Sequence, residues 1–186
     1  MSEASKGIVG TTAPVSKVTA SGISAQVDST ATDSVGKIVW YRDVSGSTPR
    51  VSAIKYYKAG ASVRLGAVLK QDTAARDSNR FIECAVTDAK FNYCKGIAAA
   101  AVSNTGYFSW CYVGGYVPEA LMPTNYASNQ YMMLSATEAG KLTSAFSDAT
   151  AGNATGNWTI VFQSFSVASG SSGGSTSSGV IVGWLG

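Results

Sequence analysis

Hydrophobic and polar residues alternate along much of the chain with a period of two, which is typical of β-strands and not of helices. The clearest early example is the segment GKIVWYRDV, which places Ile38 and Trp40 on one face and Val39 and Tyr41 on the other. Arg42 follows on the face of Ile38 and Trp40, so that face combines apolar and charged side chains. The pattern predicts a strand in this segment.

Further segments with strand patterns follow at spacings of roughly 8 to 15 residues, separated by turn-like residues. The Ala-rich segment 94–102 fits a short helix or a buried strand, and its flanking glycine and turn residues favour the strand. The Ser135-x-x-Glu138 spacing fits a helix capping box, but Gly140 and the β-like flanks favour a turn at 137–140. The segments expected to hold strands are 50–71, 81–88, 94–102, 107–113, 130–136, 141–146, 158–167 and 180–186. This arrangement predicts an all-β fold, a compact β-barrel or β-sandwich.

The chain divides into an N-terminal segment, residues 1–34, and a single β domain, residues 35–186. The N-terminal segment lacks helical or alternating periodicity, so it is either disordered or an extended arm that becomes ordered on a neighbouring protein. We interpret it as an extended arm. Residues 169–179, rich in Ser and Gly, are expected to be a flexible loop before the last strand. Apolar residues of the arm are candidate partner contacts: Ile8, Val9, Val15, Val18 and Ile23.

An aromatic stretch, residues 105–122, is the best candidate for a functional site. In strand geometry Phe108, Trp110 and Tyr112 point one way, and the opposite face is also apolar apart from one serine. The stretch lies within 23 consecutive uncharged residues, 96–118. Three interpretations remain open: the core of a sheet, a seam between subunits, or a platform for a sugar or base. The seam interpretation makes Trp110, Tyr112 and, near the C-terminus, Trp184 candidate partner contacts.

Charge is scarce and unevenly distributed. Only 13% of the 186 residues are charged, about half the usual share, as suits a turn-rich β protein or one whose surface is covered by partners. The net charge is +3, but thirteen of the fourteen basic residues lie within the first 95 positions, together with eight acidic ones. The basic residues are scattered singly and no nucleic-acid-binding motif accompanies them, so we expect no nucleic-acid partner.

The sequence offers little catalytic chemistry. It contains no histidine, which is the commonest general base and metal ligand. Cys84, Cys94 and Cys111 match no zinc site, and their apolar neighbours indicate buried thiols in a reducing compartment, with one disulfide and a free thiol as the alternative. There is no phosphate-binding loop, no nucleophile-elbow motif and no dinucleotide-binding motif. We therefore expect no enzyme, cofactor or metal site. Without an apolar leader or a membrane-length apolar run, assembly in a cytoplasm is expected.

Several segments together carry a family resemblance. They are GIAAAAVSNTGYFSWCYVGGYV, in which a Gly-Ile-Ala strand leads through an Asn/Gly turn to the aromatic strand, and YMMLSATEAGKLTSAF, which follows it. WTIVFQSFSV, the Ser/Gly loop and GVIVGWLG close the chain, and YYKAGASVRLGAVLKQ precedes these segments. In this order the chain, over roughly residues 50–186, resembles the decoration (cement) proteins of tailed-bacteriophage capsids.

The resemblance implies a β-barrel or β-tulip-like fold and a place on the outer capsid surface, after assembly in the host cytoplasm. It implies the major capsid protein as partner, a homo-oligomer with a trimer favoured, no membrane association and no cofactor. The implied role is to clamp neighbouring capsomers. The alternatives are another virion component (a head fibre base, a tail-tube or tail-tip protein, or a minor capsid subunit) and a host-glycan-binding module.

Overall fold

The computed structural model describes residues 6–7, 26–43, 50–90, 94–122, 131–144, 162–164, 175–177 and 180–182. These residues confirm the prediction of an all-β fold, because they form strands and one short 3-10 helix but no α-helix. The helix, η2, spans Val86–Lys90. The strands are β1 (Lys6–Gly7), β2 (Val27–Asp28), β3 (Ile38–Asp43), β4 (Arg50–Ala59), β5 (Val68–Gln71), β6 (Arg80–Glu83), β7 (Cys94–Ala98), β8 (Phe108–Val117), β9 (Ala120–Met122), β10 (Tyr131–Leu134), β11 (Leu142–Ser144), β12 (Phe162–Ser164), β13 (Ser175–Ser177) and β14 (Val180–Val182).

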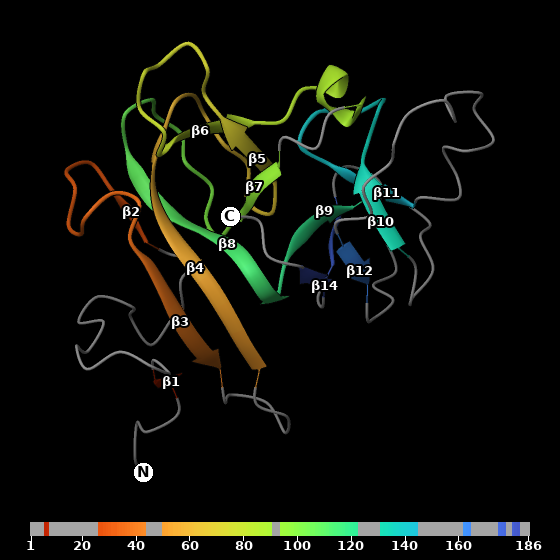
Figure 1. The fold of residues 1–186 in the computed structure, drawn as a ribbon, viewed down its shortest axis with the longest axis horizontal. Helices are drawn as coiled ribbons and strands as arrows, with labels where there is room; N and C mark the ends of the chain where they lie inside the picture. Colours follow the sequence, from red (N-terminus) through yellow and green to blue (C-terminus); the bar gives the residue numbers. More distant parts are fainter. Residues whose placement is uncertain are drawn as a thin grey trace.

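Five of these strands close into a barrel in the order β4-β6-β5-β7-β8, and β8 pairs back with β4 (Figure 1). Neighbouring strands are antiparallel except β4 and β6, which are parallel. Closure leaves no free edge in this part of the sheet. One apolar cluster receives side chains from all five strands and fills the barrel, among them Tyr57, Leu69, Phe81, Ala98 and Cys111.

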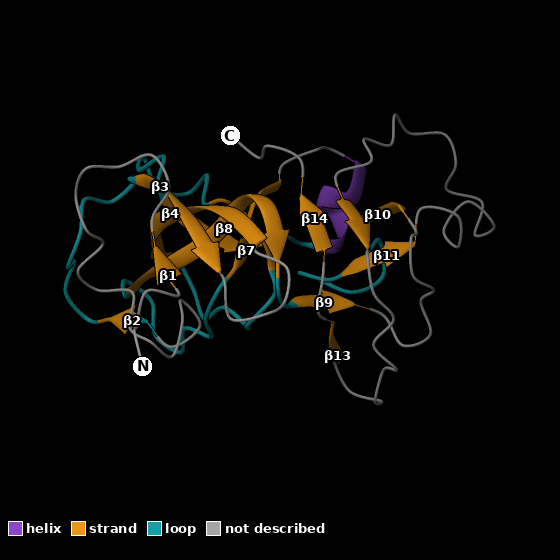
Figure 2. Cartoon of the chain, turned by 90° about the horizontal axis from the view of Figure 1, so that it is seen from below, coloured by secondary structure: helices purple, strands orange, loops and turns teal. Residues whose placement is uncertain are grey.

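A second apolar cluster lies on the outer face of the barrel wall. It joins Trp110 and Tyr112 of β8 to residues of β9, β10 and β11, such as Met122, Leu134 and Leu142. These strands form a group at one side of the barrel (Figure 2). The sheet reaches this group through β14, which pairs with the end of β8 and continues into β12, β10 and β11. β8 is therefore covered on both faces, as its uncharged sequence predicts.

β3 and the first half of β4 form a ribbon that extends beyond β5, β6 and β7 (Figure 1). β1 pairs with the end of β3, and β8 pairs with β4 from Ser52 onward, so other strands flank the ribbon on both sides. The ribbon register runs from Ile38 opposite Lys55 to Asp43 opposite Arg50. The second half of β4 belongs to the barrel, where its end pairs with β6 and its pairing with β8 continues to Lys58. A β-bulge between Ala53 and Ile54 marks the junction, where the pairing with β8 shifts by one residue.

The predicted turn at 137–140 is confirmed, because β10 and β11 pair across it with Leu134 opposite Leu142. The Ser135 hydroxyl accepts a hydrogen bond from the Glu138 backbone N–H at 3.0 Å, which is the contact expected of a helix cap. Here it closes a turn, since Gly140 with a φ of 66° redirects the chain. The predicted strand at 94–102 is confirmed for β7.

Two predictions about elements are wrong in part. The strand expected over 81–88 ends at Glu83, and η2 begins at Val86. The Asp88 carboxylate explains the change, because it accepts the Ala85 backbone N–H at 2.6 Å and so closes a helical turn. Within the Ser/Gly segment 169–179, residues 175–177 form β13, which pairs with β9. The strand expected over 158–167 is described only as β12.

Candidate partner-binding surface

The aromatic stretch belongs to the core of one chain. Trp110 is 1% exposed and Tyr112 is 5% exposed, and both pack in the outer cluster. The Trp110 ring lies 4.9 Å from the Tyr56 ring, centroid to centroid. This corrects the expectation that Trp110 and Tyr112 contact a partner, since side chains so deeply covered by their own chain have almost no surface to offer. Of the three interpretations of this stretch, the sheet core fits.

The described end of the predicted N-terminal arm packs against its own barrel. Trp110 Nε1–H donates a hydrogen bond to Gln26 Oε1 at 3.0 Å, and the Ser109 hydroxyl donates to the Gln26 carbonyl at 2.8 Å. The Tyr56 hydroxyl donates to the Asp28 carboxylate at 2.8 Å and the Thr32 backbone N–H points at the same hydroxyl. Residues 26–32 thus act as a strap that satisfies the polar atoms of buried aromatic side chains.

The remaining candidate contacts lie outside the described residues. They are Ile8, Val9, Val15, Val18, Ile23 and Trp184. For these residues partner contact stays a prediction.

A different surface has the properties of a partner contact. Among the described residues the exposed large apolar side chains are Ile38, Trp40, Val51 and Val86, and the first three belong to the β3–β4 ribbon. Trp40 is 42% exposed, Ile38 40% and Val51 39%. Ile38, Trp40 and Arg42 alternate along β3 and so share one face of the ribbon. Val51 lies opposite Arg42 and Lys55 lies opposite Ile38, so both belong to the same face. We call this surface the ribbon face, defined by Ile38, Trp40, Arg42, Val51 and Lys55.

The ribbon face is positively charged. Arg42 is exposed and Lys55 half-buried, and within the part of the chain that the structure describes neither forms an ion pair. The Lys55 ammonium lies 5.2 Å from the centre of the Phe81 ring at the end of the barrel. The opposite side of the ribbon is a core surface, with Val39 at 2% and Ile54 at 0% exposure. The ribbon therefore has one exposed face that is apolar and positively charged, and its other face packs in the core.

The sequence places the β3 members of the ribbon face together but does not mark them as exposed. The period-two pattern already put Ile38, Trp40 and Arg42 on one face. Alternation alone does not say which face of an apolar strand is covered by the rest of the fold. Charge does not distinguish the two faces either, because Lys37 and Asp43 lie on the face of Val39 and Tyr41.

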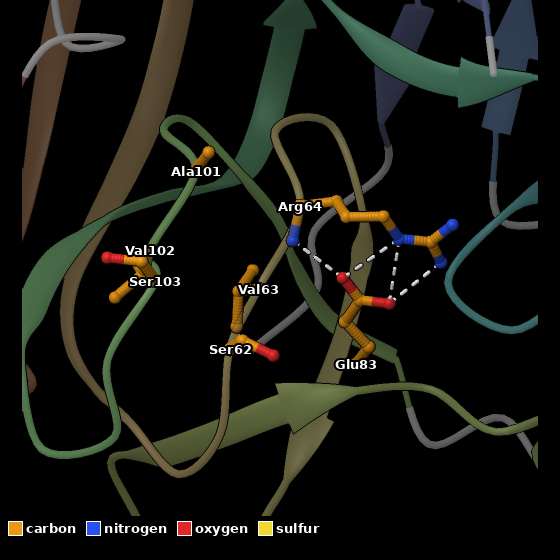
Figure 3. Close-up of a pocket in the computed structure, with 7 residues that line it drawn as sticks. All are labelled: Ser62, Val63, Arg64, Glu83, Ala101, Val102 and Ser103. Carbon is orange, nitrogen blue, oxygen red and sulfur yellow. Dashed lines mark hydrogen bonds and ion pairs between the residues drawn. The ribbon is translucent and has the colours of Figure 1, made fainter. Parts of the chain in front are cut away.

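A pocket of about 400 Å³ beside the barrel is lined by Ser62, Val63, Arg64, Glu83 and residues 101–103 (Figure 3). Arg64 reaches across to Glu83, with Nη2 2.8 Å from Oε2, and its backbone N–H donates to Oε1 at 2.6 Å. The arginine also donates to the Ala139 carbonyl, and its pKa is raised by the hydrogen bonds to Glu83. The carboxylate is thus neutralised by a contact that ties the loop after β4 to the β10–β11 turn, which is a structural role.

A second cavity of about 380 Å³ contains Lys70, Gln71, Thr73, Asp88 and Lys95. Lys70 Nζ lies 2.7 Å from Asp88 Oδ2 and both side chains are largely buried, so this ion pair joins η2 to β5. Searching the described residues for three or more clustered His, Cys, Asp or Glu side chains that could hold a metal finds none. The same residues include no helix long and apolar enough to cross a membrane.

Cys84, Cys111 and the barrel tyrosine, Tyr57, are held in their neutral forms. Burial raises the pKa of Cys111 to about 12, and a side-chain hydrogen bond with Cys94, together with burial, raises the pKa of Cys84. All three cysteines are free and buried. Burial also raises the pKa of Tyr57, whose hydroxyl has no hydrogen-bond partner among the described residues. Thiols with raised pKa are poor nucleophiles, so this arrangement is structural.

Tyr57→Phe is expected to raise the free energy of unfolding at pH 7 by about 1 kcal/mol, because it removes a buried hydroxyl without a partner. The difference should widen above pH 10. There the unfolded wild-type phenol ionises while the folded one stays neutral, so wild-type stability falls as pH rises. Urea denaturation of both proteins from pH 7 to pH 11 measures this. Cys84 and Cys111, whose pKa values are also raised, contribute the same decline in both proteins, beginning near pH 9. A variant less stable than the wild type at pH 7 would contradict the prediction.

Comparison with known proteins gives no match: no family model, curated protein or solved structure is significantly similar to this chain.

Proposed function

We propose that the chain is a non-enzymatic structural protein of a virion, which binds the outer surface of a tailed-bacteriophage capsid and stabilises it by bridging neighbouring capsomers. The observation that carries the proposal is the ribbon face, an exposed indole between two cations on strands that project from a closed barrel. The resemblance of residues 50–186 to capsid decoration proteins names the class of partner. The major capsid protein is the proposed partner, and a homo-oligomer, with a trimer favoured, is the proposed assembled form.

The physical basis of such a role is mass action. A protein that binds the assembled shell and not its separated parts lowers the free energy of the shell by the binding free energy of every copy. Many copies with modest individual affinity therefore stabilise a shell strongly, and a copy that bridges two capsomers gains further from multivalency. A small closed barrel suits this role, because closure leaves its strands no free edges.

A second proposal, another virion component, predicts the same ribbon face but a different copy number. A tail-tip or fibre-base protein is present in a handful of copies, whereas a decoration protein is present in numbers comparable to the capsid subunit. Glycan binding through the aromatic stretch is disfavoured, since Trp110 and Tyr112 are buried and stacking on a sugar needs exposed rings.

Co-sedimentation of the purified protein with empty shells that lack it tests the proposal. We expect saturable binding at roughly one copy per capsid subunit, and a shell that resists heat or chelator treatment better when decorated. Shells already saturated with the protein are the control, since they should take up no more. Absence of binding to the undecorated shells would overturn the proposal, and saturation at a few copies per particle would favour the second one.

A further inference from the structure

We infer that the ribbon face is the surface that contacts the shell, and that the shell offers an apolar recess for Trp40 with carboxylates placed to meet Arg42 and Lys55. This inference deepens the proposed function and rests on it. The three other prominent features of the described chain serve the fold. Arg64 pairs with Glu83 and Lys70 with Asp88, Cys84 has a hydrogen bond with Cys94, and the Cys111 thiol donates to the Lys55 carbonyl.

The ribbon face is accessible and is fixed in shape. β3 and the start of β4 extend beyond β5, β6 and β7 (Figure 1), and the side chains of Ile38, Trp40 and Val51 are 39% to 42% exposed. Its reverse side is held by Val39, Tyr41 and Ile54, which are buried in the outer cluster. A face held by a packed core loses little conformational entropy when it binds, and that increases affinity for a given area.

The composition of the ribbon face matches the centre and rim of a protein interface. Trp and Arg are the residue types that most often contribute a large share of binding energy. Trp40 lies opposite Ala53 in the middle of the face, and each end pairs an apolar side chain with a cation, Ile38 with Lys55 and Val51 with Arg42. Since neither cation forms an ion pair in the described part of the chain, both are available to carboxylates of a partner.

The same charges argue against a second copy of this chain as the occupant in a two-fold contact. In such a contact each residue of the patch meets the patch of the other copy. Arg42 and Lys55 of one protomer would then approach Arg42 and Lys55 of the other, and like charges facing each other across an interface are costly. An acidic partner surface has the complementary chemistry.

Two matched pairs of variants test the apolar centre and the charged border separately. Val51→Ser removes an exposed apolar side chain from the ribbon face, and Val86→Ser removes one of similar exposure from η2. Arg42→Glu reverses a charge on the ribbon face, and Arg76→Glu makes the same change at an exposed loop position. Trp40→Ala tests the central side chain, and thermal melts show whether each variant remains folded.

Binding to empty shells is measured by co-sedimentation over a range of protein and salt concentrations. We expect Trp40→Ala to weaken binding about 30-fold and Val51→Ser about fivefold, with Val86→Ser unchanged. Arg42→Glu should weaken binding about tenfold at low salt and flatten its dependence on salt, because screening then has one fewer attraction to remove. Arg76→Glu should bind like the wild type.

The outcomes separate the inference from the proposed function. If the wild type binds shells and the folded ribbon variants bind equally well, the inference is wrong and the proposed function stands. If the wild type does not bind, both fail. If wild-type oligomers dissociate in the Trp40 and Val51 variants, as measured by light scattering, the ribbon face is a contact between copies and the inference is overturned.

Discussion

Trp110→Ala is expected to lower the free energy of unfolding by about 3–5 kcal/mol, which is a large share of the stability of a typical domain. Trp110 is 1% exposed and packs against Tyr56 in the outer cluster. Its removal leaves a cavity in the barrel wall and deprives Gln26 Oε1 of its indole donor. The strap over residues 26–32 should loosen as a consequence, because this hydrogen bond is one of those that attach it.

Urea denaturation followed by circular dichroism measures the effect of Trp110→Ala. Trp40→Ala is the matched control, since it removes the same side chain from the ribbon face and should cost about 1 kcal/mol at most. Hydrogen exchange of the Thr32 amide reports on the strap. A folded Trp110→Ala protein of wild-type stability would show that this indole is not part of the core and would reopen the interpretation of the aromatic stretch as a binding platform.

The sequence pattern predicted the parts of the fold that depend on local periodicity. Twenty-three uncharged residues around Trp110 implied a strand covered on both faces, and β8 is such a strand. Glycine and turn residues after Ser135 implied a reversal, and β10 and β11 pair across it. These features follow from neighbouring residues alone, because a strand's two faces and a turn's backbone are set within a few positions.

The features that the sequence did not reveal depend on distant contacts. Closure of the barrel needs the parallel pairing of β4 with β6 and the antiparallel pairing of β4 with β8, which join segments far apart in the chain. The hydrogen bond from Trp110 to Gln26 joins residues that lie 84 positions apart in the sequence. The choice of Trp110 as a partner contact failed for this reason, since the apolar strand was visible in the sequence but the segment that covers it was not. The same limit hid the ribbon face, because no local rule predicts that Trp40 keeps 42% of its surface exposed.

The junction between barrel and ribbon depends on one glycine. Gly115 lies opposite Ser52 at the β-bulge, with a φ of 79° that other residues seldom adopt. A Cβ atom added there would come within 2.3 Å of the Val51 carbonyl oxygen. The buried Ser52 hydroxyl donates to the Tyr116 carbonyl beside the bulge and so satisfies a polar group there. The bulge lets the strands that wall the barrel continue outward as the ribbon.

Gly115→Ala is therefore expected to lower the free energy of unfolding by about 2–5 kcal/mol, since it adds backbone strain to a collision with main-chain atoms. Gly106→Ala separates the two causes. Gly106 has a φ of 87°, but its nearest neighbour would be the flexible end of Lys58 at 4.0 Å, so only the strain of about 1 kcal/mol remains.

Denaturant unfolding of both variants, with shell binding measured at a temperature where each is folded, gives the comparison. Equal losses of stability would show that the close approach at Gly115 is relieved at little cost, and would leave the bulge without its assigned role. The expected result is a larger loss for Gly115→Ala together with weaker shell binding, because displacing Val51 and Ser52 also displaces the ribbon face. Gly106→Ala should bind shells like the wild type.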